Sequence, residues 1–211
     1  ITDSIECTFD TVFELIQPNP LGLDTIIPRI NNWEIPCAGD ASGEITLIPL
    51  GGADSTLNSY LWSTDTGSLE DVNSMNQNDL TEGNYTVLVT DINGCEYQES
   101  YEMLDPPPLV IDTLYADSAY CHGSPSGVIY FNAYGGVLGY DYLWNNGETT
   151  EDIDSLFAGV YTIRLTDDNG CIVRDSVEVF EADHFDVDIR IASDHEGAMI
   201  SCTNASDGEI D

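Results

Sequence analysis

The chain alternates between short hydrophobic runs and clusters of Gly, Asn and Asp. Within the runs, β-branched and aromatic residues recur at every second position, which is the spacing of a strand with one buried face. No run shows the period of a convincing amphipathic helix. The pattern therefore predicts an all-β protein of antiparallel strands. The clearest predicted strands are 109–115, 127–133, 140–144, 160–166 and 172–180.

Two phrases in the sequence occur more than once. Cys37, Cys121 and Cys202 are each followed by a Gly six residues later, and they are spaced by 84 and then 81 residues. A second phrase, Gly-x-Tyr-Thr followed by Thr-Asp-x-Asn-Gly-Cys, ends at Cys95 and at Cys171, with the same twelve residues from its first Gly to its Cys. Its Asn-Gly pair predicts a hairpin turn, because both residues tolerate the positive φ that a tight turn demands. A period of this length indicates tandem domains.

The repeat divides the chain into four parts. We expect 1–19 to be the C-terminal strand of a preceding repeat and 184–211 to be the N-terminal part of a following one. Two complete repeats, 20–107 and 108–183, lie between them. Because the sequence starts and stops within a repeat, we expect it to be an excerpt of a longer array.

Each complete repeat has the length and strand content of an immunoglobulin-like (Ig-like) β-sandwich. Trp62 and Trp144 fall on the third clear strand, where such a sandwich places a core indole. The spacing Leu-x-x-Gly-x-Tyr, which ends at Tyr85 and Tyr161, is typical of a tyrosine corner before the penultimate strand. The linkers between repeats are short and rich in Pro. Such linkers are stiff, so we expect the sandwiches to form an extended rod.

Composition narrows the classes of function. The chain has 39 acidic residues against four basic ones, and its formal net charge is −35. Nucleic-acid binding and attachment to an anionic membrane surface both need clustered Arg or Lys, so the charge excludes them. No stretch approaches the roughly 18 apolar residues of a membrane span, so we expect no membrane insertion. Six cysteines without a Cys-x-x-Cys pair favour disulfides in an oxidising compartment.

The sequence offers no catalytic constellation. His122, His184 and His195 have no partner at metal-ligand spacing, and neither a Gly-x-Ser-x-Gly elbow nor a phosphate-binding loop is present. We therefore predict a protein that is not an enzyme and needs no cofactor. Calcium is the one candidate ion, because it takes oxygen ligands and the Asn-Gly turns gather them. The candidate ligands are Asp91, Asn93, Asp167, Asp168 and Asn169.

The cysteines admit two pairings. The default joins the cysteines of one repeat, as Cys37–Cys95 and Cys121–Cys171. A Greek-key sandwich argues against it, because each pair would then lie at opposite ends of a domain, about 20–25 Å apart. A disulfide requires Cα atoms within about 7 Å. The alternative joins successive repeats as Cys37–Cys171, and both pairings stay open here. Under the alternative, four cysteines need other partners: Cys7, Cys95, Cys121 and Cys202.

The repeated phrases, together with the Gly-Gly and Tyr-x-Trp motifs between them, resemble the SprB-type repeat of giant cell-surface adhesins from gliding bacteria. The resemblance covers nearly the whole chain. It departs from the pattern at Asn204, which stands at a Gly position, and in an insertion between Trp62 and Gly83. It implies export by type IX secretion and display on the bacterial cell surface. The implied role is the structural stalk of an adhesin or surface filament, used in attachment and gliding motility, with neighbouring repeats of the same chain as partners.

The resemblance also implies O-glycosylation. In that bacterial lineage the acceptor is Ser or Thr between Asp and a small set of mostly apolar residues, and this chain has eight such triplets. Composition alone would give about one or two. The competing interpretation is that Asp-Ser and Asp-Thr mark turns and strand edges. The candidates are Ser4, Thr11, Thr25, Ser55, Thr113, Ser118, Ser155 and Ser176.

Two alternative functions remain beside the stalk. The aromatic residues within 130–144 would form a sugar-stacking surface if they faced solvent, so the repeat itself would bind a surface polysaccharide or a partner protein. The chain would otherwise be a subunit of a self-assembling extracellular fibre. Retention of glycans by purified repeats distinguishes the first alternative, and lateral or helical contacts between chains distinguish the second.

Overall fold

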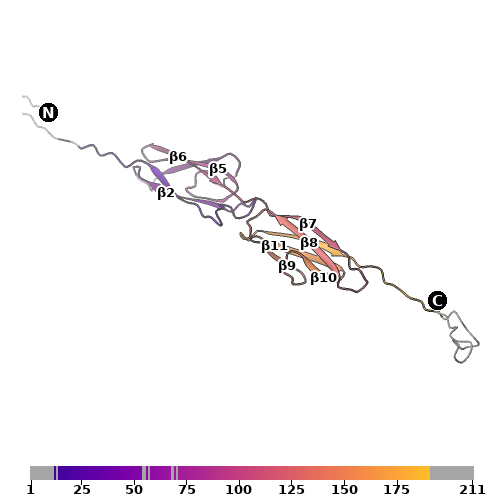
Figure 1. The fold of residues 1–211 in the computed structure, drawn as a ribbon. Coiled ribbons are helices and arrows are strands. Elements are labelled where there is room, and N and C mark those ends of the chain that lie inside the picture. The colour runs from indigo at the N-terminus through magenta and orange to yellow at the C-terminus, as the bar shows by residue number, and fades with distance from the viewer. Residues whose placement is uncertain are drawn as a thin grey trace, which may run out of the picture. The chain divides into compact units, whose positions relative to one another are not determined.

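The computed structural model describes residues 12, 14–53, 56, 58–67, 69 and 71–190. These residues form twelve β-strands and no helix (Figure 1). The all-β prediction is therefore confirmed. Each of the five clearest predicted strands is present, and its ends lie within two residues of those expected.

The first six strands form two three-stranded sheets with the orders β1-β2-β4 and β3-β5-β6. The strand pairs within both sheets are antiparallel. The strands are β1 (Gly22–Ile26), β2 (Gly43–Leu50), β3 (Ser59–Thr64), β4 (Gln77–Leu80), β5 (Gly83–Thr90) and β6 (Glu96–Met103).

The next six strands repeat this arrangement, with the sheet orders β10-β8-β7 and β12-β11-β9. In both cases the first, second and fourth strands form one sheet and the third, fifth and sixth form the other. This is the division of an Ig-like sandwich that lacks its fourth strand. The strands are β7 (Val110–Asp117), β8 (Gly127–Tyr134), β9 (Asp141–Trp144), β10 (Ile153–Leu156), β11 (Gly159–Thr166) and β12 (Ile172–Val179).

Contacts between Cα atoms divide the chain into two compact units. The first unit contains the described residues up to Asp112 together with Ala133–Leu143 and Arg164–Arg174. The second contains Thr113–Asn132, Trp144–Ile163 and the described residues from Asp175 onward. The first unit thus includes the turn that carries Cys171.

The hydrophobic core of strands β1–β6 follows from alternation along the strands. Tyr85, Val87 and Val89 on β5 are fully buried, while the residues between them are less buried. Trp62 on β3 is also buried, and its indole N–H donates a hydrogen bond of 2.8 Å to the Ser74 carbonyl. Because its one polar group is paired, the indole can lie in the core as predicted.

Trp144 occupies the equivalent place on β9. Its side chain is buried, and its N–H donates to the Thr150 carbonyl at 2.9 Å. The ring meets Phe131 edge to face, with centroids 6.1 Å apart, which is a favourable aromatic geometry. Other residues of these strands are buried as well, including Ile129, Ile153, Leu156, Ile163 and Leu165.

Both predicted tyrosine corners are present. The Tyr85 hydroxyl donates a hydrogen bond of 2.9 Å to the Thr81 carbonyl, and the Tyr161 hydroxyl donates one of 3.0 Å to the Phe157 carbonyl. Tyr85 is fully buried, whereas Tyr161 is only half-buried. The same motif therefore holds the start of the penultimate strand in two different environments.

The Gly-Gly pair after β2 and after β8 attaches the Pro-rich linker to the sandwich. Gly51 and Gly135 have φ of 64° and 82°, and a Cβ on either would lie within about 2 Å of the carbonyl oxygen of Pro20 or Pro108. Only Gly fits this close approach. Gly-Gly therefore recurs in the sequence because the linker passes too close to the first Gly for any side chain.

The two corners provide a matched pair of variants. We expect Tyr85→Phe to destabilise the β1–β6 core by about 1–2 kcal/mol, because it leaves the Thr81 carbonyl without a donor beside a buried ring. Tyr161→Phe should cost less in its own sandwich, since water can replace the lost hydroxyl. Urea unfolding followed by tryptophan fluorescence measures both. Equal losses at the two positions would contradict this explanation.

Candidate functional site

Cys37 lies between β1 and β2, in a segment that is tied to the end of β6. Just before it, the buried Ile35 donates its N–H to the Leu104 carbonyl at 3.1 Å. Just after it, Gly39 donates its N–H to the Asp105 carboxylate at 2.7 Å, and Asp40 donates to the Cys37 carbonyl at 3.1 Å. We call this segment, residues 35–40, the Cys37 socket.

Cys171 lies on the turn between β11 and β12, and a single carboxylate organises that turn. One oxygen of Asp167 accepts the N–H groups of Asn169 at 3.0 Å and Cys171 at 2.9 Å. Its other oxygen accepts the N–H of Val137 at 2.9 Å. Asp167 is only 4% exposed, and its hydrogen bonds compensate for the burial of its carboxylate. We call residues 167–171 the Cys171 turn.

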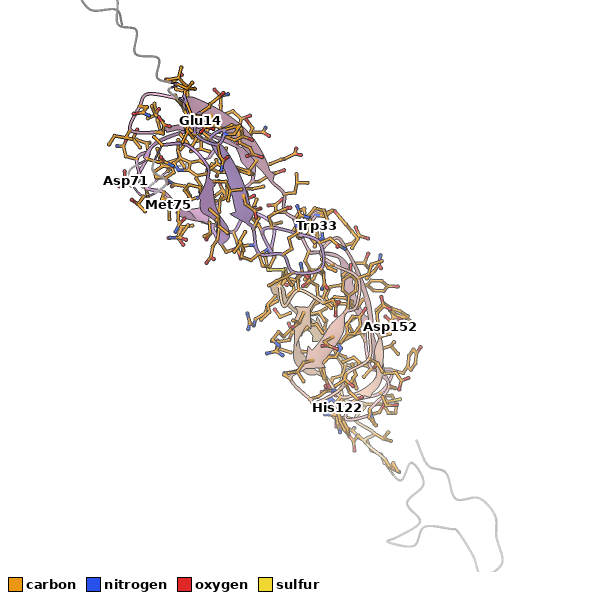
Figure 2. All side chains as sticks on the ribbon, turned by 90° about the vertical axis from the view of Figure 1, so that its left-hand side faces the viewer. Glu14, Trp33, Asp71, Met75, His122 and Asp152 are labelled. Atoms are coloured by element: carbon orange, nitrogen blue, oxygen red, sulfur yellow. A yellow bond between two sulfur atoms is a disulfide. The ribbon has the colours of Figure 1, made fainter. Side chains whose placement is uncertain are left out.

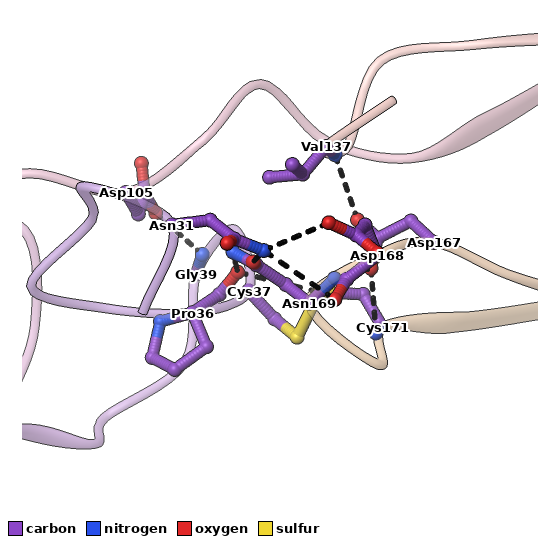
Figure 3. Close-up of a disulfide and its surroundings, with 10 residues drawn as sticks. All are labelled: Asn31, Pro36, Cys37, Gly39, Asp105, Val137, Asp167, Asp168, Asn169 and Cys171. Carbon is purple, nitrogen blue, oxygen red and sulfur yellow. Dashed lines mark hydrogen bonds between the residues drawn. A yellow bond between two sulfur atoms is a disulfide. The ribbon is translucent and has the colours of Figure 1, made fainter. Parts of the chain in front are cut away.

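The socket and the turn are joined by a disulfide between Cys37 and Cys171, with Cα atoms 5.6 Å apart (Figure 3). Beside it the Asn169 amide donates a hydrogen bond of 2.8 Å to the Pro36 carbonyl. All four residues belong to the first compact unit. Of the two pairings that the sequence left open, the structure contains the one between successive repeats.

Asn31 adds a polar contact that the sequence analysis did not find. Its amide donates to the side-chain oxygen of Asn169 at 2.7 Å and to the Asp168 carboxylate at 3.1 Å (Figure 3). Asn31 and the next residue both have positive φ, and reciprocal backbone hydrogen bonds of 2.9 Å join Ile30 to Trp33 around them. This tight turn directs Asn31 at the Cys171 turn.

A signal for this contact was present in the spacing of the repeats. Cys37 stands seventeen positions after Pro20, but Cys121 stands only thirteen after Pro108. The four extra residues include the positive-φ turn around Asn31. An Asn-Asn pair within an insertion of this kind is a usable indication of a turn with a specific contact.

Glu34 also holds the segment that contains the four extra residues before Cys37. Glu34 is only 7% exposed, accepts the Arg29 guanidinium at 2.6 Å and accepts the N–H of Leu104 at 3.2 Å. Its carboxylate is thus paired as a buried charge requires.

The five calcium candidates lie on two equivalent turns. Asp91 repeats the role of Asp167, since one of its oxygens accepts the N–H groups of Asn93 and Cys95 at 2.9 Å and the other accepts that of Ala53 at 3.0 Å. These hydrogen bonds lower the pKa of Asp91 below its ordinary value, and the one from the Cys95 N–H has the largest effect. Both carboxylates therefore act as acceptors for the backbone. Within the part of the chain that is described, no cluster of three or more metal-ligating side chains occurs, and calcium binding stays a prediction.

The O-glycosylation candidates fall into three groups. Thr25 and Thr113 are half-buried on strands, whereas Ser118, Ser155 and Ser176 are exposed. In three of these triplets the Asp bonds its own neighbour, through the N–H of Thr25 at 2.9 Å and of Ser176 at 2.7 Å and through the hydroxyl of Ser155 at 2.8 Å. The Asp thus has a local structural role, and glycosylation stays a prediction. Three candidates lie outside the described residues: Ser4, Thr11 and Ser55.

Two further cysteines, Cys95 and Cys121, are exposed and carry free thiols. They correspond in the repeat to Cys171 and Cys37 respectively. Cys7 and Cys202 lie outside the described residues. We call the socket and turn joined by Cys37–Cys171 the complete junction. The described residues also contain one unpaired cysteine at a socket position, Cys121, and one at a turn position, Cys95.

Comparisons with known proteins give a fold likeness only. Neither a protein-family model nor a curated protein matches this chain. The chain is similar to the extracellular domains 3–5 of Drosophila OTK, at 12% identity and a TM-score of 0.37, over 66% of this chain and 56% of that one. It is also similar to the N-terminal eight Ig domains of Down Syndrome Cell Adhesion Molecule, at 12% identity and a TM-score of 0.39, over 79% and 25% of the two chains.

A third similar structure is a C-terminal fragment of intimin in complex with the intimin-binding domain of the translocated intimin receptor. The identity is 12%, the TM-score is 0.41, and the match covers 84% of this chain and 67% of that one. The chain spans about half of the first of these three structures and a quarter of the second. At these scores the functions of these proteins carry no inference for this one, and the Ig-like assignment rests on the sheets themselves. No helix among the described residues is long and apolar enough to cross a membrane.

Chemical cleavage distinguishes the two disulfide pairings. Cyanogen bromide cuts after methionine, and the chain has Met75, Met103 and Met199. Without reductant we expect fragment 1–75 to stay joined to fragment 104–199, because Cys37–Cys171 connects them. Electrophoresis or mass spectrometry of the digest measures this.

Reductant should separate these fragments, and Cys37→Ser should separate them without it. The pairing within repeats predicts a different product, with fragment 1–75 joined to 76–103 through Cys95. Recovery of that product would contradict the Cys37–Cys171 bond.

Proposed function

We propose that this chain is a non-enzymatic, extracellular repeat module that forms part of the stalk of a cell-surface adhesin or filament. The observation that carries the proposal is the Cys37–Cys171 disulfide, which connects two successive repeats instead of closing one. A bond at that place adds nothing to a catalytic centre. It fastens one module to the next, which is what a load-bearing stalk requires.

The disulfide also supports the extracellular location. Structural disulfides persist in oxidising compartments and are rare in the cytosol. The net charge of −35 suits the same setting, because like-charged chains displayed side by side repel one another and stay separate.

The finer proposal follows the resemblance to SprB-type repeats. The chain would then be exported by type IX secretion and displayed on a bacterial surface, with sugars on its exposed acceptors. Ser118, Ser155 and Ser176 are the described candidates whose side chains are exposed. Sugars there would add bulk to a surface that is already strongly charged.

Small-angle X-ray scattering of the monomer tests the stalk, with Ser in place of Cys7, Cys95, Cys121 and Cys202 to prevent cross-linking. A compact chain of 211 residues has a radius of gyration of about 17 Å. We expect a clearly larger value and a distance distribution with a long tail, as a stiff stalk requires. Adding Cys37→Ser should broaden that distribution, since the modules then lose their covalent fastening. A radius near that of a compact chain would contradict the proposal.

A second candidate function has its own observation. The rings of Tyr115 on β7 and Tyr130 on β8 are stacked, with centroids 4.9 Å apart, and they are 51% and 36% exposed. Thr46 stands in the first repeat where Tyr130 stands in the second. The scaffold therefore does not need this pair. Exposed stacked rings suit the apolar face of a sugar, and the charge of −35 favours a neutral polysaccharide over an acidic one.

Affinity electrophoresis in gels that contain neutral polysaccharides tests this candidate. We expect the chain to be retarded and the double variant Tyr115→Ala, Tyr130→Ala to lose most of the retardation. Phe157→Ala is the matched control, because Phe157 is an aromatic residue of similar exposure, 57%, that is not part of the stacked pair. Equal migration of all three proteins in every gel would dismiss polysaccharide binding by these rings.

A further inference from the structure

We propose that Cys121 and Cys95 form a second junction of the same kind, in which the Cys95 turn of one copy of this chain bonds covalently to Cys121 of another copy. The inference rests on the proposed stalk function, and it names a second copy of the chain as a partner beside the neighbouring repeats of the same chain. It rests on the correspondence between the complete junction and the two unfilled halves.

The surroundings of Cys121 reproduce the Cys37 socket. Gly123 donates its N–H to the Glu181 carboxylate at 2.7 Å, and Ser124 donates to the Cys121 carbonyl at 3.1 Å. Ala119 is buried and donates to the Phe180 carbonyl at 2.8 Å. Each of these hydrogen bonds has its counterpart around Cys37, two of them at the same distance. The backbone that receives a turn cysteine is therefore already formed at residues 119–124, the Cys121 socket.

The surroundings of Cys95 reproduce the Cys171 turn. Asp91 accepts the N–H groups of Asn93 and Cys95, as Asp167 accepts those of its own turn. Gly94 donates to the Asp91 carbonyl at 2.9 Å, which is also the distance in the Cys171 turn. We call residues 91–95 the Cys95 turn. Its backbone is thus held in the same conformation as that of the Cys171 turn.

The Cys121 socket has open space beside it. Tyr120, Cys121, His122, His184 and Phe185 line a hollow of about 460 Å³. Figure 2 places His122 at the end of the sandwich where the chain continues beyond β12. At Cys37 the neighbouring space holds the Cys171 turn. The hollow is the corresponding place for another turn.

The side chains that differ between the two junctions differ in a matched way. The shorter second repeat has no counterpart of Asn31, so its socket lacks the amide that bonds Asp168 in the complete junction. The Cys95 turn has Ile92 where the Cys171 turn has Asp168, and Ile92 is 60% exposed. Both partners of the Asn31–Asp168 hydrogen bond are thus absent from the second pair of halves. Asn93 keeps the side-chain oxygen that in Asn169 accepts the other hydrogen bond of Asn31.

Exposed aromatic side chains lie around the Cys121 socket. Tyr120 stands where the Cys37 socket has Pro36, and it is 80% exposed, while Phe185 is 84% exposed. Contact with Ile92 would cover these surfaces, since burial of apolar area favours association. The Tyr120 carbonyl would accept the Asn93 amide, as the Pro36 carbonyl accepts that of Asn169.

The bond forms by oxidation of two thiols. Cys121 and Cys95 together give up two protons and two electrons as the S–S bond forms, and a small disulfide oxidant such as oxidised glutathione takes them up and is reduced to two thiols. Because one copy supplies the turn and the other the socket, each bond leaves one free turn and one free socket at the two ends. Such head-to-tail association extends into open chains, or into rings where the rotation between copies closes.

The test uses the full chain with Cys7→Ser and Cys202→Ser, incubated with oxidised glutathione. Electrophoresis without reductant should show a ladder, and peptide mapping should show Cys95 joined to Cys121. Adding either Cys95→Ser or Cys121→Ser should abolish the ladder. An equal mixture of these two variants should form a dimer and no higher species, since each retains one half of the junction.

Ile92→Asp controls for random oxidation. It keeps both thiols, but we expect it to slow cross-linking about tenfold, which corresponds to about 1.4 kcal/mol of lost contact. Arg174→Asp, at an exposed position on β12, makes a charge change elsewhere and should leave the rate unchanged.

Three results would each overturn the inference. They are persistence of two free thiols, a bond between Cys95 and Cys121 of the same copy, and symmetric Cys95–Cys95 and Cys121–Cys121 dimers in amounts equal to the mixed bond. The scattering experiment uses a monomer without these two thiols, so the stalk proposal can hold when the ladder fails. A compact monomer would refute the stalk and leave the ladder as evidence for a separate self-assembly.

Discussion

The junction between the repeats depends on one carboxylate. Asp167 accepts three backbone N–H groups, and two of these belong to Asn169 and Cys171. It therefore holds the amide and the sulfur of the turn in the positions where the Cys37 socket receives them. The socket depends in the same way on a carboxylate outside it, because Asp105 accepts the N–H of Gly39. Carboxylates, one of which the sequence offered as an ion ligand, thus hold the backbone on both sides of a covalent bond.

The sequence predicted the features that short-range patterns encode. Alternation identified the long strands, and the spacing of Trp144 and Tyr161 identified a core indole and a tyrosine corner. The sequence left the disulfide pairing open, because both pairings join a cysteine of the first repeated phrase to a cysteine of the second. It missed Asn31, whose hydrogen bonds reach 137 and 138 positions along the chain. No periodicity records a contact over that distance, and only the unequal lengths of the repeats pointed to it.

The short strands β4 and β10 show why alternation also failed locally. Each has two buried residues at its ends and two exposed ones between them. Asp79 and Ser155 have φ of 54° and 57°, and the pairing register shifts within both strands. A residue in the left-handed region interrupts the pleat, so neighbouring side chains no longer alternate between faces. A search for period two therefore does not detect these strands.

The Cys37–Cys171 bond changes how the chain would respond to tension. Its partners are 134 positions apart, and strands β2 to β11 all lie between them. A pull on the two ends of the chain passes through the sulfur atoms, so the backbone inside this closed loop carries no load. The loop withholds roughly 450 Å of contour length, at about 3.4 Å per extended residue. Among the strands of the described residues, only β1 and β12 lie on the path of force, and reduction of the disulfide, rather than a stronger pull, would release the remainder.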